Sequence, residues 1–332
     1  MNRLRMAVVI SWLVGVSACG GSSASNLPLR SVSPTAPTSS GWTISGHVTT
    51  QSGSAVKGAV VTPADLLPVT TDASGSYAIS GDGTPAENPY RLDIVGSSFL
   101  TRRVWVRWQP TGRTGVNVDV ISLSAPFSLT FYRQLARDAM ESPNALEPLA
   151  LWPGGNPNVY VRTVDDNGAP LSADVLQTLD TVIPGAVQDW TSGKLSVAAF
   201  EHGTATRQRQ DGWIIVNVVN GQSGSDVCGQ SYVGAINGLI QLSSGICTCG
   251  GNPIPRQVVA HEVGHAMGFF HVSDTGSIMY PQASPNCTNV SLSAAERFHS
   301  GVAWTRSPGN TDPDLDPSGL TPLARRDILV IN

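Results

Sequence analysis

Hydrophobic and polar residues alternate along short runs in the first third of the chain. Runs such as Thr43–Thr49, Ala59–Thr62 and Ser76–Ile79 are separated by turns rich in glycine, serine and aspartate. The stretches YRLDIVG, RRVWVRW and VNVDVIS continue this pattern. Alternation with a period of two predicts strands that bury one face, and many short strands with regular turns are typical of an antiparallel sandwich. We therefore expect an all-β domain over residues 41–122.

After residue 155 the pattern changes, and strands alternate with helices. Apolar runs predict strands, at residues 158–163, 194–201, 212–219 and 231–244. The third run is apolar enough to be buried on both faces. The last run is predicted as two strands joined at Asn237-Gly238, a strong hairpin signal.

Apolar positions at helical spacing predict a long helix over residues 171–191, with an irregularity at Pro184, and a second over residues 254–270. A shorter helix is predicted to begin at a capping box formed by Ser293 and Glu296. This mixed order indicates an α+β domain over residues 155–332. Residues 123–154 are interpreted as a connector.

The N-terminal residues have the pattern of an export signal. A short basic start precedes the apolar run MAVVISWLVGV, which is too short to span a membrane as a mature helix. The small residues VSA then precede Cys19, and this stretch resembles the lipobox of bacterial lipoproteins. The resemblance implies a signal peptide over residues 1–18, a lipid on Cys19, and export to a bacterial membrane. Gly20 favours the outer membrane or the cell surface. The alternative is a plain secretory signal.

The composition of the chain predicts a linker after the signal and argues against a nucleic-acid partner. Residues 19–40 are mainly serine, proline, glycine and threonine, and are interpreted as a flexible linker. The formal net charge is −4, and it becomes −6 when Arg3 and Arg5 leave with the signal. With no basic run in the chain, we expect no nucleic-acid partner. The oligomeric state is left open.

The first domain resembles a known module. The residues that carry the likeness are Gly46, Gly53, Gly58, Ala59, Val61, Thr71, Asp72, Gly75 and Tyr77. They are similar to those of the carboxypeptidase regulatory-like domain, which implies a transthyretin-like sandwich. Such a likeness concerns fold and leaves function open.

Three of the six histidines of the chain lie within eleven residues, in the stretch HEVGHAMGFFH. His261 and His265 are four apart, so both leave the same face of a helix and can bind one zinc ion. Gly268 can end the helix in a left-handed conformation, and His271 can then return as a third ligand. Glu262 is placed to take a proton from a water on the metal. The alternative is an amphipathic core helix with chance histidines.

The pattern H-E-x-x-H-x-x-G-x-x-H resembles that of the metzincin clan of zinc peptidases. Met279, in the stretch SIMYP, matches the methionine of the Met-turn beneath the metal, with the spacing of the matrixin branch. The resemblance implies a mixed sheet, a zinc-binding helix and no tyrosine ligand, because Pro281 stands at that place. Two matrixin features are missing from the sequence, an upstream histidine cluster and a cysteine-switch propeptide.

We therefore expect a lipid-anchored zinc endopeptidase that acts on protein or peptide substrates, with Glu262 as the general base. The substrate would lie extended along an edge strand near residues 230–238. Residues 280–285 would form the wall of the pocket for the substrate side chain that follows the cleaved bond. Two alternatives stay open. One is a surface-binding lipoprotein with an inactive peptidase domain, and the other is a hydrolase of cell-wall peptides.

Two further groups of polar residues have weaker patterns. Asp312, Asp314 and Asp316 have the spacing of a calcium loop, but the rest of that pattern is missing, so a solvated proline-rich turn is favoured. Glu296 and His299 are expected to be solvated surface residues rather than supports of the metal site.

Four cysteines besides Cys19 favour disulfides in an exported chain. They are Cys228, Cys247, Cys249 and Cys287. A bond between Cys247 and Cys249 would close a very small, strained ring. We therefore expect one of these two to pair with Cys228 and the other with Cys287. A thiolate-bound zinc is the alternative.

Overall fold

The structure is a computed structural model that describes residues 41–221, 227–248, 251–282, 291–319 and 329–331. The predicted signal, the predicted linker and Cys19 lie outside the described residues. So do Cys249 and Cys287. No helix in the described ranges has the length and apolar character that crossing a membrane requires.

Residues 41–120 form two small sheets. In the first, β1 (Gly41–Thr50) lies between β4 (Ser76–Asp82), which is antiparallel, and β7 (Val118–Val120), which is parallel. The second sheet contains four antiparallel strands, β3 (Val69–Thr70), β2 (Val60–Pro63), β5 (Tyr90–Val95) and β6 (Arg102–Val106).

One hydrophobic core joins the two sheets. Every second residue of β1, from Trp42 to Val48, is buried and faces that core. This burial follows the alternation seen in the sequence. The likeness to the carboxypeptidase regulatory-like domain, and the domain boundaries, stay predictions.

The second half of the chain is built on a six-stranded sheet. Its order is β13 (Leu329–Ile331), β11 (Gly229–Tyr232), β12 (Asn237–Ser244), β10 (Trp213–Asn220), β8 (Asn158–Arg162) and β9 (Ala199–Gly203). β10 pairs in parallel with β8 on one side and β12 on the other. Its apolar sequence therefore predicted a central strand correctly. β11 is antiparallel to both of its neighbours.

The β11–β12 hairpin turns at residues 233–236, so the predicted turn at Asn237-Gly238 is wrong. Asn237 instead begins β12, where its carbonyl and side-chain oxygens accept hydrogen bonds from Arg209. Gly234 supplies the left-handed residue, with φ of 57°. A Cβ at Gly234 would lie 1.4 Å from the carbonyl oxygen of Ala150, so the turn requires a glycine there.

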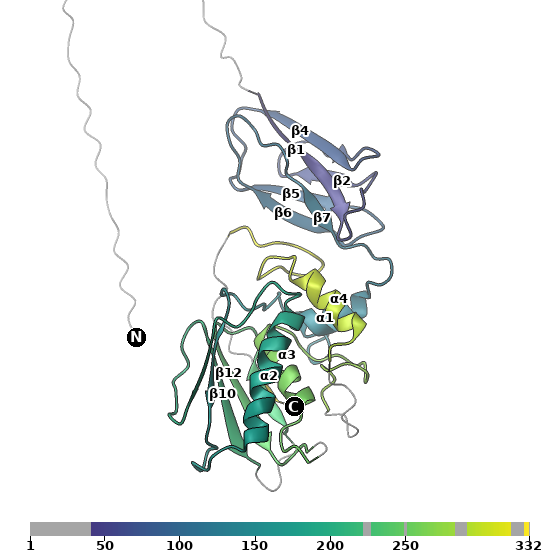
Figure 1. The fold of residues 1–332 in the computed structure, drawn as a ribbon. Helices are drawn as coiled ribbons and strands as arrows, with labels where there is room; N and C mark the ends of the chain where they lie inside the picture. The colour runs from purple at the N-terminus through teal and green to yellow at the C-terminus, as the bar shows by residue number, and fades with distance from the viewer. Residues whose placement is uncertain (1–40, 222–226, 249–250, 283–290, 320–328, 332) are drawn as a thin grey trace, which may run out of the picture. The chain divides into compact units, whose positions relative to one another are not determined.

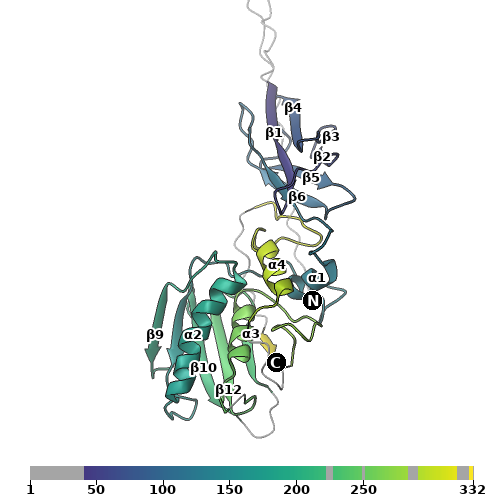
Figure 2. The same ribbon diagram turned by 45° about the vertical axis from the view of Figure 1, so that its right-hand side comes forward.

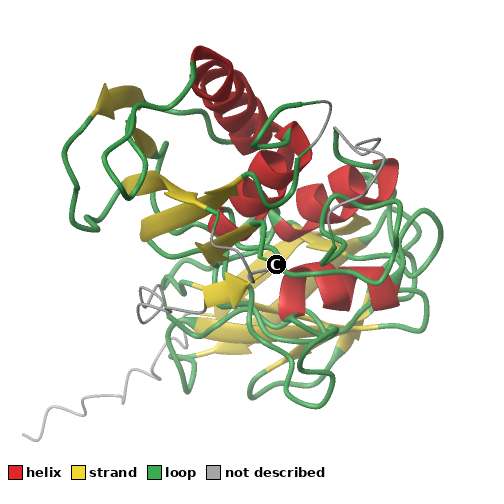
Figure 3. Ribbon diagram, turned by 90° about the horizontal axis from the view of Figure 1, so that it is seen from below, coloured by secondary structure: helices red, strands yellow, loops and turns green. Residues whose placement is uncertain are grey.

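Two helices, α2 (Ala173–Trp190) and α3 (Arg256–Ala266), cover one face of this sheet (Figures 1 and 2). Figure 3 shows the same ribbon with helices in red and strands in yellow. The indole of Trp190 donates a hydrogen bond to the carbonyl oxygen of Ala260 and ties the two helices together. Pro184 lies inside α2. Two shorter helices, α1 (Leu129–Arg137) and α4 (Ala294–Ala303), complete the described helices. The mixed α+β architecture is compatible with the expected metzincin-like domain.

The aspartates at calcium-loop spacing face arginines. The ion pairs are Arg133–Asp312, Arg102–Asp314, Arg306–Asp314 and Arg102–Asp316. The side chains of Arg306 and Asp314 are both 0% exposed, so the predicted solvated turn is wrong at Asp314. Because Arg102 belongs to β6, this loop connects the two halves of the chain.

Candidate metal centre

The candidate site is built on α3, whose sequence places two histidines on one face. His261 and His265 are one turn apart, and the helix ends at Ala266. Gly268 follows with φ of 106°, as the sequence predicted. A Cβ at this glycine would also lie 2.4 Å from the carbonyl oxygen of Ala150. Glycine is therefore required both by the backbone angle and by the space, and the turn returns the chain to His271.

The structure brings the three predicted histidines together. The ring centroids of His261, His265 and His271 are 4.7 to 5.3 Å apart. One nitrogen from each ring can be chosen so that all three lie within 4.8 Å of one another. All three residues are at most 5% exposed. Among the described residues, they form the one cluster of this kind.

Each imidazole directs its Nδ1 atom to an acceptor outside the cluster. His261 faces the carbonyl oxygen of Ile278 at 2.6 Å, and His265 faces that of Phe269 at 2.7 Å. His271 faces the carboxylate of Glu141 at 2.7 Å. Because carbonyl and carboxylate oxygens accept hydrogen bonds, each Nδ1 carries the hydrogen, and in a neutral ring Nε2 then has a free electron pair.

These electron pairs point at one another. The Nε2 atoms of His261 and His265 are 2.9 Å apart, and neither neutral ring has a hydrogen to place between them. A cation placed between the rings turns this unfavourable contact into ligation. Three neutral imidazoles with their outer nitrogens hydrogen-bonded are the usual donor set for zinc. The residues present therefore fit the metal that the sequence predicts.

Glu262 lies next to the cluster and is fully buried. A small hollow opens beside it, lined by Cys228, Gln257, Val258, His261, Glu262, Tyr280 and Pro281. The strand β11 passes so close that a Cβ at Gly229 would lie 2.4 Å from Oε1 of Glu262. The carboxylate thus shares one hollow with the first histidine.

Met279 is fully buried beneath the helix. A Cβ at Gly264 would lie 2.7 Å from its sulfur, so the glycine of the motif lets the methionine approach α3 closely. The carbonyl oxygen of Met279 accepts a hydrogen bond from the backbone N–H of Val272, one residue after His271. The methionine therefore packs between the two chain segments that carry the histidines.

Glu296 supports this segment, and its predicted surface position is wrong. Its side chain is 0% exposed and accepts hydrogen bonds from the N–H of Met279, at 3.0 Å, and from the hydroxyl of Ser277. Its second oxygen completes the capping box with Ser293 at 2.7 Å. The sequence showed the cap, but not that the same carboxylate also holds the segment whose Ile278 carbonyl faces His261.

His299 is buried too, again against the prediction. Its Nδ1 atom faces the carbonyl oxygen of Ala295 at 2.7 Å, and its Nε2 accepts the N–H of Ser128 at 2.9 Å. The rings of Phe127 and Phe131 pack against it. Burial lowers the pKa of His299 from its ordinary value of 6.5. The residue joins α1 to α4 and lies apart from the metal cluster.

Sequence reasoning missed Glu141. This residue lies 130 positions before His271, within the predicted connector, and no motif marks it. Burial opposes ionisation of Glu141, but hydrogen bonds with His271 and Asp138 lower its pKa overall. Only the fold could reveal this contact.

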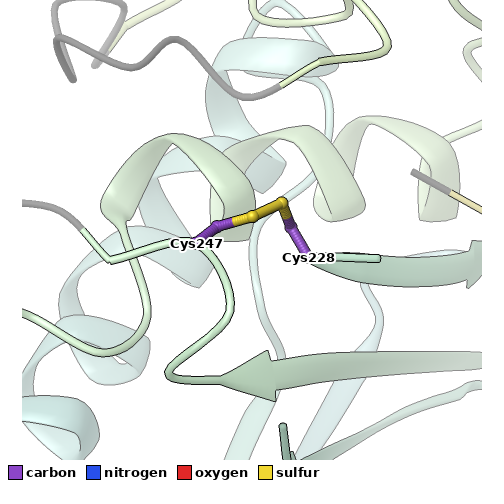
Figure 4. The surroundings of a disulfide bond; sticks show 2 residues. All are labelled: Cys228 and Cys247. Atoms are coloured by element: carbon purple, nitrogen blue, oxygen red, sulfur yellow. A yellow bond between two sulfur atoms is a disulfide. The ribbon is translucent and has the colours of Figure 1, made fainter. Parts of the chain in front are cut away.

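A disulfide joins Cys228 to Cys247, with the two Cα atoms 5.4 Å apart (Figure 4). It is one of the bonds that the sequence left open, and it holds the start of β11 beside the site. Cys249 and Cys287 lie outside the described residues, so their pairing stays a prediction.

Comparison with known families supports the site. The Matrixin family model matches residues 253–297. The model for Metallo-peptidase family M12B Reprolysin-like matches residues 186–272. Both ranges contain the three histidines and Glu262, and the first also contains Met279. Comparison with curated proteins gave no match. The partial family matches and the histidine cluster together support a metallopeptidase of the metzincin type.

Proposed function

We propose that the protein is an exported, zinc-dependent endopeptidase. The observation that carries the proposal is the convergence of three buried imidazoles, each of which has its Nδ1 atom facing an oxygen acceptor outside the cluster. Buried Glu262 lies beside this cluster, in the hollow that His261 also lines. The family matches over the same residues add support.

In the proposed mechanism, His261, His265 and His271 hold the zinc ion. When bound, zinc supplies a Lewis acid for the scissile carbonyl and lowers the pKa of a water molecule. Glu262 takes a proton from the attacking water and later gives it to the leaving amine.

The surroundings of Glu262 favour this role. The carboxylate is fully buried, and Gly229 allows β11 to pass directly against it. A peptide aligned with β11 would bring its backbone to this carboxylate. Buried Glu296 holds Met279, whose sulfur lies against the helix that carries His261 and His265.

The test compares two glutamine variants of the full-length protein. Glu262→Gln should keep its zinc but cleave casein about 10²–10⁴-fold more slowly, because no carboxylate takes the proton. Glu201→Gln, a control on β9 whose side chain is 44% exposed, should behave like the unchanged protein. A chelator should abolish cleavage in both the control and the unchanged protein.

Two outcomes would reject the proposal. Near-normal turnover of Glu262→Gln would remove this residue from the mechanism. Zinc-loaded protein that cleaves no protein substrate would favour the surface-binding alternative, whereas cleavage confined to cell-wall peptides would favour the cell-wall hydrolase.

We also propose that a lipid on Cys19 anchors the protein to a bacterial membrane. The small residues before this cysteine, at the end of an apolar run, support the proposal. Cys19→Ser should move the protein from the membrane fraction to the soluble fraction, because serine cannot carry the thioether-linked lipid. Sedimentation of the variant with membranes in high salt would contradict this.

A further inference from the structure

The three histidines are oriented by two kinds of acceptor. His261 and His265 face backbone carbonyls of residues within a short distance along the chain, Ile278 and Phe269. His271 faces a side chain, the carboxylate of Glu141, from a distant segment. A carbonyl is fixed by the fold, but a carboxylate can be removed by one substitution. The orientation of the third ligand therefore depends on one identifiable residue.

Backbone contacts of α1 and of the turn after it position both Glu141 and His271. Glu141 follows the end of α1, where Asp138 adopts a left-handed conformation and its carbonyl accepts the N–H of Ser142. On the other side, the N–H of Phe270 donates to the carbonyl of Leu135 in α1. Because α1 binds the chain directly before His271, the carboxylate and the imidazole are positioned by one set of backbone contacts.

We propose that Glu141 is the positioning residue for the third metal ligand. By accepting the hydrogen on Nδ1, it fixes the imidazole of His271 in the tautomer whose Nε2 faces the cluster. Its negative charge also makes the ring a stronger donor to a cation. The proposal rests on the metal-binding part of the proposed function, and it does not depend on which peptide is cleaved.

The test measures zinc affinity of the full-length protein by competition with a chelator. Glu141→Ala should weaken zinc binding about 10- to 100-fold. Glu141→Gln should recover most of the loss, because its amide oxygen still accepts from Nδ1. Glu201→Ala is the matched control, since its side chain is 44% exposed and that of Glu141 is 43% exposed. This control should bind zinc normally.

A second measurement needs no metal. Nitrogen NMR of the metal-free protein should show one tautomer for His271, and Glu141→Ala should convert it to a mixture. Unchanged zinc affinity, or an unchanged tautomer in Glu141→Ala, would overturn the proposal. If the unchanged protein bound no zinc, the proposed function itself would fail, and the two failures are therefore distinguishable.

A second inference comes from the other side of the site. β11 runs along α3, since Gly229 lies against Glu262 and the N–H of Gly234 donates to the carbonyl of His265. The sequence predicts an edge strand near residues 230–238 along which an extended substrate would lie. In the structure, β13 pairs antiparallel with that edge, in the register Tyr232 to Leu329, Ser231 to Val330 and Gln230 to Ile331.

We infer that Leu329–Ile331 competes with an extended peptide for the backbone of β11. A strand edge offers one row of N–H and C=O groups, and two peptides cannot use the same row. The chain's own segment therefore lowers the apparent affinity for substrate while it is paired. This inference rests on the proposed function only for its effect on cleavage.

Val330→Pro tests the pairing, because proline has no N–H and is poorly tolerated inside a paired strand. In Glu262→Gln protein, which is expected to cleave very slowly, the added Val330→Pro change should speed hydrogen exchange of the β11 amides. Val330→Ala is the control and should leave exchange slow. A synthetic peptide of residues 327–332 should restore protection.

In the active protein, Val330→Pro should lower KM for a peptide substrate with little change in kcat. Equal exchange rates in the proline and alanine variants would overturn the pairing. Altered exchange with an unchanged KM would overturn the competition.

Discussion

The three buried histidines of the metal cluster and the buried His299 look alike until their ring nitrogens are compared. In the metal cluster and at His299, every Nδ1 atom faces an oxygen acceptor. The Nε2 of His299 accepts a hydrogen bond from the N–H of Ser128, so the ring has both of its bonds. The Nε2 atoms of His261 and His265 instead face each other at 2.9 Å. Burial therefore does not mark a candidate ligand, whereas converging acceptors do.

The largest expected effect is on zinc binding, which should depend on the cluster histidines and not on His299. His265→Ala should weaken zinc binding by several orders of magnitude, because two ligands remain from three. His299→Gln should bind zinc normally, because its ring lies outside the cluster. Metal analysis after dialysis checks both. Full zinc occupancy in His265→Ala would show that the ligand set is different.

Glu296→Ala tests how much the buried carboxylate that holds Ser277 and Met279 contributes to stability. The change leaves the hydroxyl of Ser277 without its buried acceptor and removes one of the two acceptors of the Met279 N–H. An unsatisfied buried group costs about 1–3 kcal/mol, so we expect a loss of about 3 kcal/mol in the free energy of unfolding. Urea unfolding of the metal-free protein measures it, with Glu201→Ala as the exposed control. A loss no larger than that of the control would contradict the role of Glu296.

His299→Gln should cost less, about 1–2 kcal/mol. The amide oxygen of glutamine can still accept from Ser128, but the packing of the ring against Phe127 and Phe131 is lost. The same unfolding experiment measures the change. A loss of unfolding free energy larger than that of Glu296→Ala would contradict this prediction.

The smallest effect is a pH dependence that belongs to His299. Burial lowers its folded-state pKa, so below about pH 6.5 the unfolded state takes up the proton first. Stability contributed by the neutral ring is complete above that pH and is lost as pH falls toward the folded-state pKa. Metal-free wild-type protein should therefore lose more stability between pH 7 and pH 5 than His299→Gln. Parallel curves for the two proteins would refute this.

The sequence predicted those parts of the site that depend on local spacing. His261 and His265 share a face because a helix repeats every 3.6 residues, and Gly268 turns the chain because its conformation is open to glycine. The central strand β10 was likewise predictable, because its apolar residues fit only a strand covered on both faces.

The supporting carboxylates could not be predicted in this way. Glu141 meets His271 across 130 residues, and Glu296 meets Met279 across 17. A charged residue is expected at the surface unless it has a partner, and the partner is known only once the chain is folded. Asp314 was misplaced for the same reason, because Arg306 and Arg102 neutralise it inside the protein.

The loop after α4 also decides how the protein can be divided. Arg306 pairs with Asp119 in β7 as well as with Asp314, and the backbone of Arg103 in β6 exchanges hydrogen bonds with residues 314 and 316. Deleting residues 41–122 would remove Asp119 and Arg102 and leave charges in the remaining half without their partners. Breaking a buried ion pair costs about 3–5 kcal/mol, a large share of the stability of an ordinary domain. Any chimera that exchanges the N-terminal sheets should therefore carry residues 306–316 from the same parent.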